Sequence, residues 1–324
     1  MYTLTDIRTV HLEVTSRCQA SCPMCARNIQ GGIDNPFMTI VEITLDQFKE
    51  WFSVEFIRQL DRLFMCGNLG DPIIANDTLK IFEYIREVNP DITLSMNTNG
   101  SARNLQFWKR LAEARVHVRF GIDGLTDTHR MYRIGTDWGK IIDNAKNFIT
   151  AGGHATWDML VFEHNKHQVE LCKELSESIG FKKFVSKNTA RFSNTQLNVL
   201  NKEGKTIHIL YPTDRSKQIP VNKKSATINC KVQKEKSLYI SATGTVSPCC
   251  WLDNEWQSPN NPNRIDYMDK IGTRLSLYKN TLEELFEQNV FTAIESTWEC
   301  NPLKECSKQC GETDRLTNNL IENE

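Results

Sequence analysis

The sequence predicts an α/β protein in which six strand–helix alternations precede a smaller cysteine-rich region. Between residues 9 and 187, short β-rich runs alternate with segments whose apolar residues recur at helical intervals. The cysteines are unevenly placed, with three in residues 18–25 and six in residues 230–310. We therefore expect a first domain over residues 1–200, a linker over residues 201–229 and a second domain over residues 230–324.

Six runs predict the strands of the first domain, at residues 9–14, 62–67, 92–97, 116–122, 156–162 and 181–186. Five amphipathic segments between them predict helices, at residues 44–60, 77–88, 103–113, 136–149 and 166–179. The first helix opens with Thr44 and Gln47 at the spacing of a capping box. Such an alternation implies parallel strands joined by right-handed crossovers, which fits a doubly wound sheet or a barrel. In both folds the chemistry gathers at the carboxyl ends of the strands.

The pattern changes after residue 187. Residues 188–229 are polar and irregular, and residues 202–236 hold nine Lys or Arg against three acidic residues. This stretch is typical of a solvated linker, and the alternative is a landing site for an acidic substrate. Residues 237–251 then predict a hairpin around Thr243 and Gly244.

Composition excludes several classes of protein. The chain has 324 residues with a net charge of −1, which argues against a nucleic-acid partner and RNA modification. No apolar run approaches the roughly 20 residues of a membrane span, and no signal peptide opens the chain. We therefore expect a cytoplasmic protein without a membrane partner. In that reducing compartment, clustered thiols favour metal binding over disulfides.

Cys18, Cys22 and Cys25 form a CxxxCxxC motif directly after the first predicted strand. A structural zinc site uses four protein ligands, and no fourth Cys or His follows nearby. Three thiolates with one open position suit a [4Fe–4S] cluster whose fourth iron takes an outside ligand. Cys66 and Cys172 are expected to be buried core thiols, with lining of the cavity as the alternative for Cys66.

This motif, at the head of a (β/α)₆ pattern, resembles the radical S-adenosylmethionine (SAM) superfamily. The resemblance implies a partial (β/α)₆ TIM-like barrel in which SAM chelates the cluster bound by the three cysteines. Reductive cleavage of SAM would give a 5′-deoxyadenosyl radical that abstracts a substrate hydrogen. Arg17 and Arg27, beside the motif, are candidates to offset the thiolate charge, and the alternative is that they are solvated loop arginines.

Three further segments carry the resemblance. Gly70, Asp71 and Pro72 resemble the glycine-rich segment that receives the SAM amino group, with Asp71 where the family has Glu. Asn97 and Asn99 lie in "NTNG", which resembles the polar segment after the third strand. Residues 121–133 are similar to the Ser-Ile-Asp-Gly…His-x-x-x-Arg stretch, which makes Asp123 and Arg133 cofactor-binding candidates and implies that Arg133 faces the SAM carboxylate. Gly121 stands where the family has Ser.

The late cysteines resemble the SPASM/twitch auxiliary-cluster domain. Cys230, Gly244 and Cys249 match its opening, and Cys300, Cys306 and Cys310 match its later motif, whose first position is Thr297 here. The number of thiols implies one auxiliary [4Fe–4S] cluster, held by Cys230, Cys249, Cys306 and Cys310 with Cys300 as an alternative ligand. A zinc ribbon on the same thiols is the other reading.

Four neighbours of these thiols are not expected to bind the cluster. Cys250 is expected to point to the opposite face of a strand from Cys249. Three tryptophans, Trp251, Trp256 and Trp298, are expected to pack around a cluster rather than to relay electrons.

The resemblance predicts a radical SAM oxidoreductase that oxidises or cross-links a peptide side chain or dehydrogenates a small hydroxylated metabolite such as an aminosugar. It also implies an electron donor such as flavodoxin or ferredoxin. The alternative is a non-catalytic iron–sulfur protein for electron transfer or metal binding, and SAM binding would separate the two.

Overall fold

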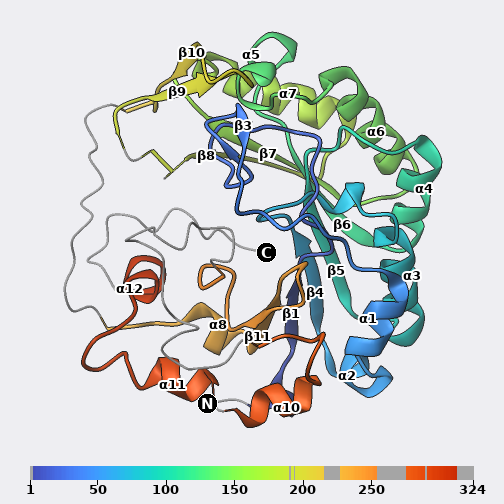
Figure 1. The fold of residues 1–324 in the computed structure, drawn as a ribbon. Helices are drawn as coiled ribbons and strands as arrows, with labels where there is room; N and C mark the ends of the chain where they lie inside the picture. The colour runs from blue at the N-terminus through green and yellow to red at the C-terminus, as the bar shows by residue number, and fades with distance from the viewer. Residues whose placement is uncertain are drawn as a thin grey trace.

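The fold is organised by one curved sheet of eight strands, in the order β12-β11-β1-β4-β5-β6-β7-β8 (Figure 1). The computed structural model describes residues 3–189, 191–192, 194–214, 227–253, 275–288 and 290–311. All neighbours in the sheet pair in parallel except β11 and β12. Its strands are β1 (Thr9–Leu12), β4 (Arg62–Cys66), β5 (Thr93–Thr98), β6 (Val116–Gly121), β7 (Ala155–Val161), β8 (Lys183–Asn188), β11 (Ser237–Ile240) and β12 (Val246–Ser247).

Helices α1 to α7 lie along the outer, convex side of the sheet (Figure 1). They are α1 (Leu45–Trp51), α2 (Val54–Gln59), α3 (Thr78–Val88), α4 (Leu105–Glu113), α5 (Thr126–Tyr132), α6 (Trp138–Thr150) and α7 (Val169–Ile179). The later helices are α8 (Lys231–Lys234), α10 (Leu282–Glu287), α11 (Val290–Glu295) and α12 (Lys304–Cys310). Short 3₁₀ turns are η1 (Leu4–Asp6), η2 (Pro72–Ile74) and η3 (Lys166–Gln168). No helix in these described ranges is both long and apolar enough to cross a membrane.

The six predicted strands and their order are confirmed, and the sheet is the partial barrel that the resemblance implied. Alternation along the strands separates two environments. On β4 and β5, Leu63, Met65, Leu94 and Met96 pack into the core beneath the helices, whereas Cys66 and Asn97 alternate with them on the concave face. Cys172 is fully buried, as expected. Cys66 is only half-buried, so the expectation of a core thiol was wrong.

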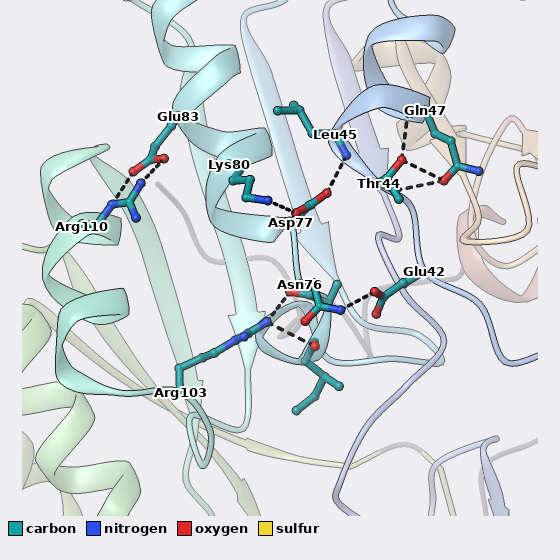
Figure 2. Close-up of polar contacts among 12 residues, drawn as sticks. Glu42, Thr44, Leu45, Gln47, Asn76, Asp77, Lys80, Glu83, Arg103 and Arg110 are labelled. Carbon is teal, nitrogen blue, oxygen red and sulfur yellow. Dashed lines mark hydrogen bonds and ion pairs between the residues drawn. The ribbon is translucent and has the colours of Figure 1, made fainter.

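The helix expected over residues 44–60 is two helices, because Ser53 starts a second one by accepting a hydrogen bond from the Phe56 N–H. The Thr44–Gln47 capping box is confirmed (Figure 2). Figure 2 also shows Asp77, before α3, accepting hydrogen bonds from the Leu45 N–H at 3.0 Å and from Lys80 at 2.7 Å. These contacts join α1 and α3 on the outer layer.

Two small hairpins lie outside the main sheet. One joins β2 (Asn28–Ile29) to β3 (Ile33–Asp34) directly after the cysteine motif, and the other joins β9 (Leu197–Leu200) to β10 (Thr206–Leu210). The second hairpin lies in a stretch expected to be partly irregular, and it crosses the expected domain boundary at residue 200. The predicted hairpin around Gly244 is confirmed, and its strand β11 pairs with β1. The division into domains remains a prediction.

Candidate functional site: two thiol clusters on adjacent strands

The cysteine motif forms a tight loop after β1. The Cys25 N–H donates to the Cys22 carbonyl at 2.9 Å, and the Asn28 N–H donates to the Cys25 carbonyl at 3.3 Å. Burial raises the pKa of the Cys18 thiol to about 12 and that of Cys22 to about 11. The negative charge of neighbouring thiols adds to both shifts. These thiols therefore share one neighbourhood in which a bound metal would have to stabilise their ionised forms.

Asn99 connects the end of β5 to this loop. Its side-chain amide donates to the Cys18 sulfur at 3.6 Å, and its side-chain oxygen accepts from Gln19 at 2.7 Å. The Ala20 N–H donates to the same sulfur at 3.4 Å. N–H donors stabilise a thiolate, so the polar segment after the third predicted strand lies beside the first cysteine.

Asp71 is buried behind the loop. Its carboxylate accepts hydrogen bonds from the Thr98 hydroxyl at 2.8 Å, the Asn99 N–H at 2.7 Å and the Ile73 N–H at 3.2 Å. Burial raises the pKa of this carboxyl group. Asp71 therefore fixes the segments after β4 and β5 to each other, and Pro72 behind it starts η2.

Gly70 is required by a close approach of two loops. The Asp71 N–H donates to the Arg17 carbonyl at 2.8 Å, and a Cβ atom on Gly70 would collide with the Thr15 carbonyl. A larger residue at this position would therefore separate the glycine-rich segment from the cysteine loop.

Arg133 and Asp123 form a buried ion pair. Arg133 Nε donates to Asp123 Oδ2 at 2.6 Å, while Asp123 Oδ1 accepts from the Leu160 N–H at 2.6 Å. The Asp123 side chain is 0% exposed and that of Arg133 is 20% exposed. The guanidinium also lies beside Cys22, where its positive charge lowers the pKa that burial raises. Arg133 thus places a positive charge next to the cysteine loop.

Arg17 and Arg27 contact oxygen atoms, and their role in offsetting the thiolate charge remains a prediction. Arg27 donates to the Ser16 carbonyl and, at 3.3 Å, to the Leu69 carbonyl. Arg17 pairs with Glu42 at 3.7 Å. The sequence could not distinguish these arginines from Arg133, because proximity along the chain does not set the direction of a side chain.

Asn97 lies on the concave face of the sheet, away from the cysteine loop. Its amide donates to the Cys66 sulfur at 3.1 Å. His11 Nε2 lies 3.0 Å from the Cys66 carbonyl and 3.4 Å from the Glu13 carboxylate. Together with the Asn97–Cys66 hydrogen bond, these contacts connect polar side chains of β1, β4 and β5.

The late cysteines surround a second site. Cys230, Cys249, Cys306 and Cys310 line one cavity together with apolar residues that include Leu252, Ile294 and Trp298. An antiparallel bridge between Ile228 and Gly311 brings the first and last of these thiols together. Cys300 is exposed and does not line the cavity.

Three of these four sulfurs have a backbone N–H donor. The backbone of Gln233 donates to Cys230, Lys231 to Cys310, and both Trp251 and Leu252 to Cys249. The Trp298 indole lies beside Cys306, and its buried Nε1 has no hydrogen-bond partner among the described residues. The Cys230 thiol donates to the Cys310 sulfur, which lowers the pKa of Cys310 and raises that of Cys230. Such donors suit sulfurs that carry negative charge. Trp256 lies outside the described residues.

Cys249 and Cys250 lie in a turn rather than on a strand, so the reason for expecting Cys250 to point away was wrong. Cys250 instead hydrogen-bonds to His11 of β1. Three residues after Cys250, Asp253 accepts from the Tyr239 hydroxyl of β11 at 2.9 Å. The turn that carries Cys249 is therefore fixed to the sheet.

The thiols suit a multi-iron cluster. The four late thiols line a cavity, and the early three lie on one loop. Because a [4Fe–4S] cube receives its thiolates at separate corners, these residues fit such a group.

A partial barrel with a three-cysteine loop after its first strand defines a class of iron–sulfur protein. The chain belongs to the radical SAM superfamily, whose family model matches residues 12–175. Membership indicates an enzyme and implies SAM and a [4Fe–4S] cluster.

Solved structures share the fold. SuiB of Streptococcus suis, bound to S-adenosylmethionine, matches with a TM-score of 0.60 and 11% identity over 92% of this chain and 71% of that chain. Native anSMEcpe with bound AdoMet matches with a TM-score of 0.58 and 18% identity over 93% of this chain and 89% of that chain. SuiB bound to the precursor peptide SuiA matches with a TM-score of 0.57 and 11% identity over 86% and 64%.

Proposed function

We propose that the protein is a radical SAM oxidoreductase with two [4Fe–4S] clusters. Cys18, Cys22 and Cys25 would hold the first, and Cys230, Cys249, Cys306 and Cys310 the auxiliary one. With SAM bound, the first cluster supplies the electron that generates a 5′-deoxyadenosyl radical. The observation that carries the proposal is the cavity lined by four thiols, three of which accept from backbone N–H groups.

The chain's own residues would position SAM. Gly70 keeps the backbone of the glycine-rich segment against the cysteine loop, and Asp71 fixes that segment to Asn99. Asp123 holds the Arg133 guanidinium beside Cys22, where a positive charge suits both the thiolates and the SAM carboxylate.

A second cavity, lined by residues from both thiol-bearing parts of the chain, offers a place for the substrate. It is lined by Thr15 and Ser16 on the way to Cys18, by Leu69 of the glycine-rich segment, and by Asp253 after Cys249. Glu13 and several hydroxyl groups also line it. This lining favours a substrate rich in hydrogen-bond donors, such as a hydroxylated or amine-bearing metabolite or a polar peptide side chain. Peptides are bound in the SuiB and anSMEcpe complexes, which supports keeping the peptide alternative.

The iron content of the anaerobically reconstituted protein tests the assignment. Wild type should hold about eight irons, and the Cys18→Ala, Cys22→Ala, Cys25→Ala triple variant about four. A Cys306→Ala, Cys310→Ala variant should also lose about four, while the matched Cys300→Ala variant should keep all of them. About four irons in wild type, falling to none in the triple variant, would remove the auxiliary cluster. Failure of dithionite-reduced protein to release 5′-deoxyadenosine from SAM would favour the electron-transfer alternative.

A further inference from the structure

A buried carboxyl–imidazole pair lies at the carboxyl end of β1. His11 Nε2 is 3.4 Å from Glu13 Oε1, and the two side chains are 9% and 3% exposed. Neither side chain belongs to the residues proposed above to hold a cluster or to position SAM. Because burial of ionisable groups costs free energy, a pair that is kept beside a cavity indicates a chemical task.

The neighbouring strands fix this pair in place, because β1 lies between β4 and β11 in the sheet (Figure 1). After β4, the Asn68 N–H donates to Glu13 Oε1 at 2.8 Å. The His11 ring stacks on Phe64 of β4, with ring centroids 4.4 Å apart. It also packs edge-on against Tyr239 of β11, with centroids 4.9 Å apart.

The contacts of His11 show which atoms of the pair hold a proton. His11 Nε2 lies 3.0 Å from the Cys66 carbonyl oxygen, which can only accept, so Nε2 carries a proton. Burial lowers the pKa of His11, but hydrogen bonds with Cys250 and Glu13 outweigh burial and hold that pKa well above its usual value. The ring is therefore an imidazolium at neutral pH, and Glu13 is the member of the pair that can still accept a proton.

The pair connects the second cavity to the auxiliary thiols. Glu13 lines that cavity. His11 contacts Cys250, the residue after the proposed ligand Cys249. An electron that arrives on the auxiliary cluster would therefore add negative charge close to the pair, in an interior where charges interact strongly.

The surroundings of Glu13 favour proton uptake. Burial raises the pKa of the Glu13 carboxyl group, and further negative charge nearby would raise it again. The ionisable side chains around the pair come from every element packed against it: His11 of β1, Cys66 of β4, Tyr239 of β11, and Cys250 and Asp253 of the turn after β12.

We propose that Glu13 takes up a proton when the auxiliary cluster gains an electron, and that Glu13 is thereby the proton acceptor in the oxidation of an alcohol. The inference rests on the proposed function. The 5′-deoxyadenosyl radical removes the hydrogen atom from the alcohol carbon. The remaining carbon radical becomes a carbonyl group by losing one electron and the hydroxyl proton. The electron reduces the auxiliary cluster, and the proton passes to Glu13.

The test measures the reduction potential of the auxiliary cluster against pH, without substrate. The parent protein is the full reconstituted chain with Cys18→Ala, Cys22→Ala and Cys25→Ala, which the proposed function leaves with the auxiliary cluster alone. We would add Glu13→Gln, Glu13→Asp or Glu83→Gln to this parent. Glu83→Gln is the matched control, because it makes the same chemical change on the outer layer, where Glu83 pairs with Arg110 (Figure 2). Potentiometric titrations followed by EPR would run from about pH 6 to about pH 9, and infrared difference spectra would compare the oxidised with the reduced protein.

The potential of the parent and of the Glu83→Gln control should fall as the pH rises. The slope should reach up to about 59 mV per pH unit, the one-electron equivalent of a tenfold change in proton concentration. The potential of Glu13→Gln should be nearly independent of pH, whereas Glu13→Asp should keep the dependence because it keeps a carboxyl group. Reduction of the parent should also produce the infrared band of a protonated carboxyl group, which Glu13→Gln should lack.

A potential that does not depend on pH in the parent, or an equal slope in Glu13→Gln, would overturn the inference and leave the proposed function standing. If Glu13→Gln does not fold, the infrared spectrum of the parent decides, and a missing carboxyl band would overturn the inference. Absence of auxiliary iron from the parent would instead remove the proposed function, and the inference with it.

Discussion

Gly121 and Arg133 share one space: a Cβ atom on Gly121 would lie 2.5 Å from Arg133 Nη2 and 2.9 Å from its Cζ. Gly121 is the position where the family pattern has Ser. The Arg133 guanidinium therefore occupies the space that the serine side chain of the family pattern would need. The same guanidinium pairs with Asp123 and lies beside Cys22.

We expect Gly121→Ser to displace Arg133 and to destabilise the fold by about 1–3 kcal/mol, as overpacking of a filled site does. Urea unfolding of the apo protein would measure this change. The reconstituted variant should also lose iron from the first site more readily, because its neighbouring cation has moved. The control is Gly139→Ala in α6, where a Cβ atom has only an ordinary contact at 3.4 Å. Equal stability of Gly121→Ser and wild type would refute the steric argument.

Asp71→Asn should cost about 1–3 kcal/mol, because both carboxylate oxygens accept hydrogen bonds and an amide group would face a donor at one of them. The substitution also disturbs the contact with Asn99, so the affinity for SAM should fall in equilibrium binding to the reconstituted protein. Asp77→Asn removes a comparable acceptor on the outer layer (Figure 2). It should leave SAM affinity unchanged, and a loss there would mean that the effect of Asp71→Asn is not local.

His129 should make stability fall in mild acid. Its Nδ1 accepts from the Asp123 N–H at 3.1 Å, and its Nε2 donates to Thr136, whose own hydroxyl donates to the Arg133 carbonyl. Burial, and then the positive charge of Arg133, lower the pKa of His129 to about 3, and the hydrogen bonds suit the neutral ring. The unfolded chain therefore binds an extra proton between about pH 6.5 and pH 3, and stability falls as the pH falls through that window.

From pH 7 to pH 5.5, the contribution of His129 should fall by about 1 kcal/mol. Denaturant titrations at both pH values would measure it. His164, whose pKa is also lowered, to about 4, adds a second dependence, so the comparison is between wild type and His129→Gln. The variant should be less stable at pH 7 and should lose less stability on acidification. Parallel pH profiles for the two proteins would contradict the assignment.

Trp298→Phe should keep the proposed auxiliary cluster but lower its reduction potential. The indole N–H lies in the cavity beside Cys306 and has no partner among the described residues, so it is available to donate to a bound cluster. The substitution removes this N–H while retaining an aromatic ring. A hydrogen bond worth about 1 kcal/mol corresponds to roughly 40 mV for one electron. A potentiometric titration followed by EPR would detect the shift. Trp251→Phe is the control, because Trp251 donates to Cys249 through its backbone. Equal shifts in both variants would point to a change in packing instead.

Much of the fold was predictable because local patterns determine it. Each of the six strands contained a run of apolar residues. The predicted helices between them contained apolar residues at helical intervals along one face. The β9–β10 hairpin escaped prediction because its exposed face carries Ile207 and Ile209, so apolar residues do not mark a single buried face. The pairing of β11 with β1 escaped because register between distant segments leaves no local signal.

The candidate site, like the fold, could be predicted from the sequence only in part. The spacing of the early cysteines was visible in the sequence, as was the preference for Cys306 and Cys310 over Cys300. The N–H donors to the late sulfurs were not, because they are backbone groups whose direction depends on the turn. Cys66 appeared to be a core thiol because it ends an apolar run, yet strand alternation places it opposite Met65.

The position of β1 has a consequence for how the protein is made. This strand is held between β4, which follows it closely in the chain, and β11, which is synthesised much later. On the ribosome, the cysteine loop emerges long before the strand beside it exists, and its sulfurs remain without their final surroundings until the ribosome has passed β11. Iron insertion at the first loop is then best timed after chain release. A truncated nascent chain ending before β11 would expose reactive thiols to oxidation and premature metal capture.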